Sequence, residues 1–97
     1  MPVVMVMHWP EVSKEQYDQL LSLVHWDREF PEGAHGHVAW LGGDGFHVID
    51  VWDSPEQFQS FVETRLMPGV QQVGVQGQPK VEFYPTLGVV MPAAYTA

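Results

Sequence analysis

The sequence predicts a single α+β domain in which helices cover one face of a sheet and a second copy of the chain covers the other face. Short apolar runs alternate with two capped helical segments in the order β-α-β-β-α-β. The 97 residues match the common size of one domain, so we expect residues 1–97 to form one unit. Only 16% of residues are charged, whereas 45% are apolar, including four Trp, five Phe and five Met. This surplus of large apolar side chains predicts a subunit contact, because aromatic residues and Met are enriched at interfaces.

The first strand and the first helix have clear sequence signals. Residues Val3–Trp9 form a β-rich run that is apolar on both faces, which is typical of a strand buried on both sides. Ser13 is a good N-cap, and Gln16 three residues later completes a capping box. Apolar residues then recur at helical spacing to about Trp26, namely Tyr17, Leu20, Leu21 and Val24.

A β-hairpin is predicted where residues 35–41 and 46–52 flank the sequence Gly42-Gly43-Asp44-Gly45. Glycines supply the positive φ angles that tight hairpin turns require. Because side chains alternate along a strand, we expect His35 and His37 to share one face of the first arm.

Asp50 lies in the middle of the second arm of this hairpin. It shares a face with three large apolar residues, Phe46, Val48 and Trp52. A carboxylate on an apolar face is costly unless it is paired, and such groups are frequent at functional sites. A structural alternative is a salt bridge to Arg28 or Arg65, or a bond across a dimer interface.

The second helix begins with Ser54 as N-cap and Pro55 at the first helical position. Its buried stripe consists of Phe58, Phe61, Val62 and Leu66. We expect Pro68 and Gly69 to interrupt this helix, with another turn possible up to Val73. A last strand is predicted over residues 81–84.

The order of these elements is that of the ferredoxin-like split βαβ fold. Such a fold has one antiparallel sheet with two helices on one face, and the other face is normally polar. The first strand is nevertheless apolar on both sides. The sequence therefore predicts a sheet-to-sheet homodimer, a dimeric α/β barrel.

Two segments carry a resemblance to a known family. The run Val48-Ile49-Asp50-Val51-Trp52-Asp53-Ser54-Pro55-Glu56-Gln57-Phe58 resembles the third strand and the capped turn into the second helix of the dimeric α+β barrel superfamily. The segment from Arg65 to Val70 is similar to a variant among its small members, which are antibiotic-biosynthesis-monooxygenase-like and EthD-like proteins. The resemblance implies a pocket between sheet and helices, with Trp52 on its wall. It also implies a range of functions, from cofactor-free oxygenases and isomerases to haem-degrading enzymes and proteins without known activity.

The resemblance favours a cofactor-independent monooxygenase or isomerase of a small aromatic or polyketide-like molecule. Trp52 would shape its site, and proton transfer or oxyanion contacts would come from four expected catalytic residues: His8, His47, Asp50 and Tyr84. This hypothesis predicts a closed pocket of roughly a few hundred Å³ in which several of these groups converge. A haem-degrading role is disfavoured because those members use a His on the second helix, and this chain has none after His47.

Three alternatives stay open. The chain could be a non-catalytic dimeric module that binds a ligand or is associated with stress. It could be a metalloprotein whose ligands are histidines such as His8, His35, His37 and His47, because imidazoles hold Zn, Fe or Cu. An N-terminal Pro2 amine could act as a base, as in the tautomerase family, but Met1 precedes it and the rest of the chain does not resemble that family.

Charge and composition argue against several classes of partner. The formal net charge is −8, and the only Lys and Arg residues are Lys14, Arg28, Arg65 and Lys80. We therefore expect no nucleic-acid binding, which needs a basic stripe, and no attraction to an anionic membrane. The sequence contains no Cys, which excludes disulfides, thiolate metal sites and a Cys nucleophile and fits a cytoplasmic protein.

Overall fold

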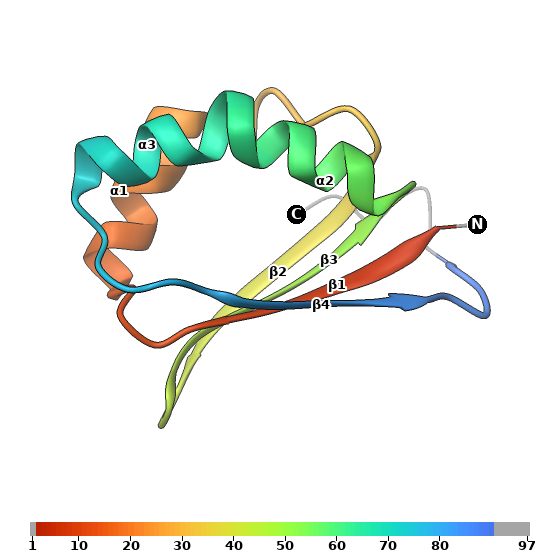
Figure 1. The fold of residues 1–97 in the computed structure, drawn as a ribbon, viewed down its shortest axis with the longest axis horizontal. Coiled ribbons are helices and arrows are strands. Elements are labelled where there is room, and N and C mark those ends of the chain that lie inside the picture. Colours follow the sequence, from red (N-terminus) through yellow and green to blue (C-terminus); the bar gives the residue numbers. More distant parts are fainter. Residues whose placement is uncertain (1, 91–97) are drawn as a thin grey trace.

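Four antiparallel strands form one sheet, and the helices cover one of its faces (Figure 1). The computed structural model describes residues 2–90; Met1 and residues 91–97 lie outside this part. The strands are β1 (Val3–Trp9), β2 (Ala34–Gly42), β3 (Gly45–Trp52) and β4 (Lys80–Pro85), in the spatial order β2-β3-β1-β4. The predicted βαββαβ order and ferredoxin-like fold are confirmed.

Helix α1 (Lys14–Val24) begins as the sequence predicts and ends slightly earlier. The Ser13 hydroxyl accepts a hydrogen bond from the Gln16 backbone N–H, and the Gln16 side chain accepts one from the Ser13 N–H, both at 3.1 Å. The helix stops at Val24 because His25 adopts a left-handed conformation with φ of 61°. The expected extension to about Trp26 is therefore wrong, and Trp26 is instead a buried residue of the loop that follows.

The second helical segment continues through the proline at which we expected an interruption. It consists of α2 (Pro55–Phe61), a π-helical turn (Val62–Leu66) and α3 (Met67–Val73). The Met67 N–H bonds to the carbonyl of Val62, five residues back. This wider turn stands directly before Pro68, whose ring would crowd a regular helix and which has no N–H to donate. No helix within residues 2–90 has the length and hydropathy needed to cross a lipid bilayer.

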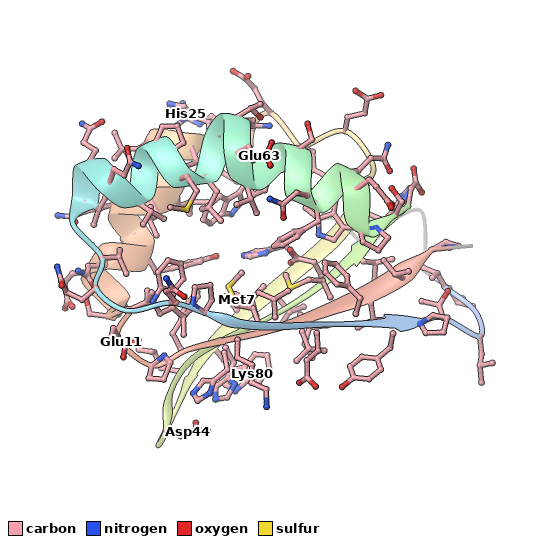
Figure 2. The ribbon with its side chains drawn as sticks, viewed as in Figure 1. Met7, Glu11, His25, Asp44, Glu63 and Lys80 are labelled. Carbon is pink, nitrogen blue, oxygen red and sulfur yellow. The ribbon has the colours of Figure 1, made fainter. Side chains whose placement is uncertain are left out.

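The core lies between the helices and the inner face of the sheet. Strands β1 and β3 contribute alternate residues to it, namely Met5, Met7, Trp9, Phe46, Val48 and Trp52. Figure 2 shows Met7 between the sheet and the helices. Helix α3 approaches α1 closely at Gly69, where an added Cβ would lie 2.9 Å from Cγ2 of Val24. The helical layer therefore requires a glycine at this crossing.

The opposite, outer face of the sheet is not covered by any described helix. Its apolar side chains come from three strands and comprise Val4, Val6, Val38, Trp40, Ile49 and Val51. Val38 is 61% exposed. Lys80 and Asp44 lie on this side of the sheet in Figure 2. The prediction that β1 is apolar on both faces is thus correct, and no helix or strand within residues 2–90 covers its outward residues.

Truncation of Met5 tests the position of the core. Met5 is fully buried, so Met5→Ala should lower the free energy of unfolding by about 2–5 kcal/mol in urea denaturation. Met67→Ala is a matched control, because the Met67 side chain is 38% exposed and its loss should change stability by less than about 0.5 kcal/mol. Equal effects of the two substitutions would contradict this assignment of the core.

Candidate functional site

A cavity of about 60 Å³ lies between the inner face of the sheet and the helices. Its walls are mostly large apolar and aromatic side chains, including Met5, Met7, Trp26, Phe46, Trp52 and Phe61. Phe30 and Pro31, from the loop after α1, lie at its edge, and Phe30 is half exposed. The cavity is smaller than the few hundred Å³ expected. Three polar side chains reach it together, those of Tyr17, His37 and Asp50.

The hairpin places His37 directly opposite Asp50. Gly42 pairs with Gly45 at the turn, and regular pairing back from there brings these two residues together on the inner face. A bulge then shifts the register between Ala34 and Gly36, so that Ala34 stands opposite Trp52.

The bulge also separates two histidines that we expected on one face. His35 is turned away from the cavity, and its Nε2 lies 2.5 Å from Oδ1 of Asp53. His37 alone lines the cavity. The expectation that His35 and His37 share a face is wrong because the extra residue breaks the alternation of the strand.

Asp50 is buried, and both of its carboxylate oxygens have partners. Oδ1 lies 2.7 Å from Nδ1 of His37, and Oδ2 accepts a hydrogen bond of 3.1 Å from the indole N–H of Trp52. The sequence offers Arg28 or Arg65 as a salt-bridge partner of Asp50, but the structure places the imidazole of His37 and the indole of Trp52 there instead. Arg65 instead donates to the carbonyl of Val24 at 2.8 Å. His37 and Trp52 therefore hold the Asp50 carboxylate from two sides at the cavity wall.

His37 connects Asp50 to Tyr17. Its Nε2 lies 3.0 Å from the Tyr17 hydroxyl. An ionised Asp50 is only an acceptor, so we assign the His37 proton to Nδ1, which leaves Nε2 to accept from Tyr17. Burial raises the pKa of Tyr17, and the negative charge of Asp50 adds to this effect. The phenol therefore stays protonated at neutral pH and acts as the donor.

This arrangement is chemically suited to proton transfer. A carboxylate bonded to Nδ1 holds an imidazole in one tautomer and stabilises its protonated form. Nε2, which here accepts from the Tyr17 hydroxyl, can act as a base once that hydroxyl is displaced. The hydrogen-bonded series Tyr17–His37–Asp50–Trp52 contains the hydroxyl, the imidazole and the carboxylate of the cavity lining.

The five residues that we expected to be catalytic do not line one site. Asp50 and Trp52 lie on the cavity wall. His8 and His47 lie on the outer face of the sheet, beside the turn between β2 and β3. Tyr84 is exposed on β4, where its hydroxyl donates to the Glu82 carboxylate at 2.9 Å.

Sequence reasoning missed the roles of His37 and Tyr17 in the cavity, although a signal for His37 existed. A two-residue turn between Gly42 and Gly45 fixes the pairing of the hairpin, and this pairing puts His37 opposite Asp50. Tyr17 carried only a packing signal, since it belongs to the apolar stripe of α1. Its contact with His37 depends on how the helix lies over the sheet.

Comparison with known proteins shows the fold. No family model matches the sequence, and no curated protein matches it. A mutant of SnoaB, a cofactor-independent oxygenase from Streptomyces nogalater, is 12% identical, with 92% of this chain and 96% of that chain covered and a TM-score of 0.64. A dimeric ferredoxin-like protein of unknown function from Thermobifida fusca is 9% identical, with coverage of 89% and 92% and a TM-score of 0.63.

A third similar structure contains a ligand. It is a monooxygenase from the gene ActVA-Orf6 of Streptomyces coelicolor in complex with Nanaomycin D. It is 20% identical, covers 95% of this chain and 92% of its own, and has a TM-score of 0.54. Because all three sequences are at most 20% identical to this chain, the comparisons show a similar backbone fold and nothing more. The chain has the ferredoxin-like fold that these oxygenases and the dimeric protein share, as the sequence resemblance implied.

Proposed function

We propose that this protein binds a small aromatic molecule in the cavity and removes a proton from it with His37. The observation that carries the proposal is the series Tyr17–His37–Asp50–Trp52, which sets one oriented imidazole in an otherwise apolar enclosure. Hydrogen-bonded polar groups that converge in an apolar pocket are the usual mark of a ligand or active site. Aromatic walls suit an aromatic ligand because they offer ring faces and edges for packing.

The proton transfer would proceed through Nε2 of His37. A substrate hydroxyl or acidic C–H takes the position of the Tyr17 hydroxyl at this nitrogen, and its proton moves onto the imidazole. Asp50 stabilises the imidazolium that forms, as a carboxylate does in other Asp–His pairs. The displaced Tyr17 hydroxyl remains as a donor to the new anion.

Two outcomes follow from the deprotonated substrate. Return of the proton to a different carbon isomerises the molecule without any further reactant. Reaction with O₂ at an aromatic-activated methylene converts CH₂ to C=O; one oxygen atom enters the product and the other leaves as water with both hydrogens. Neither outcome requires a cofactor. SnoaB, described as a cofactor-independent oxygenase, is a precedent for oxygenation without a cofactor on this fold, and the ActVA-Orf6 protein is described as a monooxygenase.

The small volume of the cavity limits the substrate. A space of about 60 Å³ does not hold a multi-ring molecule without rearrangement. Met5 and Met7 line it, and Met side chains adapt readily to new shapes. We propose that entry displaces Phe30, which is half exposed at the cavity edge, and that substrates with few rings fit best.

Substitution of His37 tests this function. We would screen hydroxylated aromatics of one to three rings by following their absorbance and the consumption of O₂. His37→Ala should lower kcat/KM for the best substrate by about 10²–10⁴, the usual contribution of a general base. His35→Ala is the matched control, because His35 lies on the same strand but is bonded to Asp53 outside the cavity, and its activity should equal that of the unmodified chain.

A turnover that survives in the His37→Ala variant would show that the base lies elsewhere. Asp50→Asn gives a second readout, since an amide cannot stabilise the imidazolium in the same way. It should lower kcat more than it raises KM. Loss of activity in both the His35→Ala and His37→Ala variants would indicate a general effect on folding and would contradict the assigned role.

A non-catalytic ligand-binding module is the second candidate. The observation in its favour is the small, largely apolar cavity. On this hypothesis the buried polar series serves to hold the sheet and α1 together. Aromatic ligands would then bind without being converted, and His37→Ala would lower the melting temperature but leave ligand affinity unchanged.

We further propose that the protein is a homodimer joined through the outer face of the sheet. Apolar side chains from β1, β2 and β3 are exposed on this face and have no helix above them. Burial of apolar area is the main driving force for association. The similar structure from Thermobifida fusca is described as dimeric, which supports a dimer here.

Ile49 provides a test of the dimer. It lies on β3 near the middle of the outer face, so Ile49→Asp should convert a species of twice 11.0 kDa into one of 11.0 kDa in light scattering after gel filtration. Leu23→Asp is the control, since Leu23 is a similarly exposed apolar residue on α1 and its substitution should leave the dimer intact. A wild-type monomer, or dissociation caused by Leu23→Asp alone, would refute this interface.

A further inference from the structure

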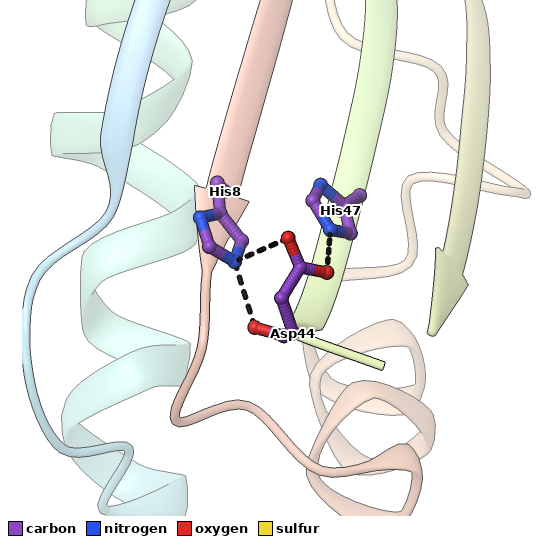
Figure 3. A group of neighbouring side chains, drawn as sticks. All are labelled: His8, Asp44 and His47. Carbon is purple, nitrogen blue, oxygen red and sulfur yellow. Dashed lines mark hydrogen bonds and ion pairs between the residues drawn. The ribbon is translucent and has the colours of Figure 1, made fainter. Parts of the chain in front are cut away.

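A second group of polar side chains lies on the outer face of the sheet, away from the cavity (Figure 3). His8 comes from the end of β1, Asp44 from the turn between β2 and β3, and His47 from the start of β3. One ligating atom from each residue lies within 4.8 Å of the others. The group combines two imidazoles and one carboxylate, which are all metal-ligating side chains.

The sheet itself sets the geometry of this group. His8 and His47 are direct partners in the register of β1 and β3, and their rings are stacked at a centroid distance of 4.4 Å with an interplanar angle of 6°. Trp40 stacks on His47 at 5.0 Å. These neighbours restrict the two imidazoles, and both Nε2 atoms face Asp44 (Figure 3).

The Asp44 carboxylate lies near the Nε2 atoms of both histidines. Its Oδ1 lies 2.6 Å from Nε2 of His47, and its Oδ2 lies 3.8 Å from Nε2 of His8. Asp44 is 65% exposed at its side chain in the single chain, and it belongs to the turn at the end of β2 and β3 rather than to the middle of the outer face where the dimer contact is proposed.

We propose that His8, Asp44 and His47 bind one divalent transition-metal ion, with Zn²⁺ as the best match. Imidazole and carboxylate bind Zn²⁺ at about 2.0–2.2 Å, which places neighbouring donors of a tetrahedral site about 3.3 Å apart. Nε2 of His47 lies 2.6 Å from Oδ1 of Asp44, Nε2 of His8 lies 3.8 Å from Oδ2, and one donor atom from each residue lies within 4.8 Å of the others. Small rotations about the outer side-chain torsions, which are soft in His and Asp, bring the donors together.

Three protein ligands leave a fourth position for water. Such an open coordination is typical of zinc sites that bind or activate a further ligand, whereas purely structural sites have four protein ligands. The ion would also connect β1 to the β2–β3 turn. This metal site lies on the opposite side of the sheet from His37 and does not depend on the function proposed for the cavity.

The site can be tested by calorimetric titration with ZnCl₂. The sample is the full chain without a tag, treated beforehand with a chelator. We expect one Zn²⁺ per chain. His47→Ala and Asp44→Asn should each weaken binding at least about tenfold, since even loss of an outer-shell partner commonly costs 10–100-fold in affinity. Asp44→Asn changes an exposed turn residue, so the variant keeps the test valid if His47→Ala disturbs folding.

His35→Ala is the matched control for metal binding. His35 is also a partly exposed histidine of the sheet bonded to an aspartate, but within residues 2–90 no third ligating side chain joins this pair. Its substitution should leave the affinity and the stoichiometry unchanged. Co²⁺ in place of Zn²⁺ should give the intense visible absorption of a tetrahedral site, and this absorption should be absent in the Asp44→Asn variant. No saturable binding, or equal affinity of the unmodified, His47→Ala and Asp44→Asn chains, would overturn the proposal.

Discussion

The buried carboxylate of Asp50 is the constraint on which the interior of this protein depends. A charge on the inner face of a sheet must find its hydrogen bonds inside the molecule, and loss of one partner of a buried pair typically costs about 3–5 kcal/mol. Here His37 and Trp52 supply these bonds. Trp52 is itself almost fully buried and packs against Phe58 and Phe61 of α2. One polar group thereby fixes the position of an aromatic cluster and, through Tyr17, the position of α1.

The sheet acts as the boundary between two different environments. On its inner side polar side chains are few, and the described part of the chain has no fully buried side-chain polar atom without a hydrogen-bond partner. On its outer side, exposed apolar residues surround charged and histidine side chains at the hairpin end. The strands have only two side-chain directions, so every residue of β1 and β3 belongs to one of these environments.

Features that depend on neighbours in the sequence could be predicted. The caps of both helices, the two-residue hairpin turn and the strands all follow from signals within a few residues, and the structure contains them. The path of the chain through Pro68 could not be predicted in the same way, because a π-helical turn absorbs the proline and leaves no clear mark in the sequence. The end of α1 was missed for a related reason, since His25 takes a left-handed conformation more usual for Gly or Asn.

The sequence predicts only part of the candidate site, because the chemical type of a residue does not say which face of a strand its side chain occupies. Asp50 and Trp52 lie two residues apart and share the cavity, as alternation requires. His47 is an odd number of residues from Asp50 and so had to point the other way, and His8 follows from its pairing with His47. The bulge between Ala34 and Gly36 shifts the pairing of β2 with β3, so that His35 and His37 do not share a face, and simple alternation along the strand does not predict this.

The alternation of β3 also has an evolutionary consequence. Phe46, Val48, Asp50 and Trp52 serve the cavity, whereas His47, Ile49 and Val51 serve the outer surface. Substitutions at the even positions of β3 therefore change the cavity, and substitutions at the odd positions change the outer face. If both proposed functions hold, the two sets of positions can vary independently of each other on an unchanged backbone.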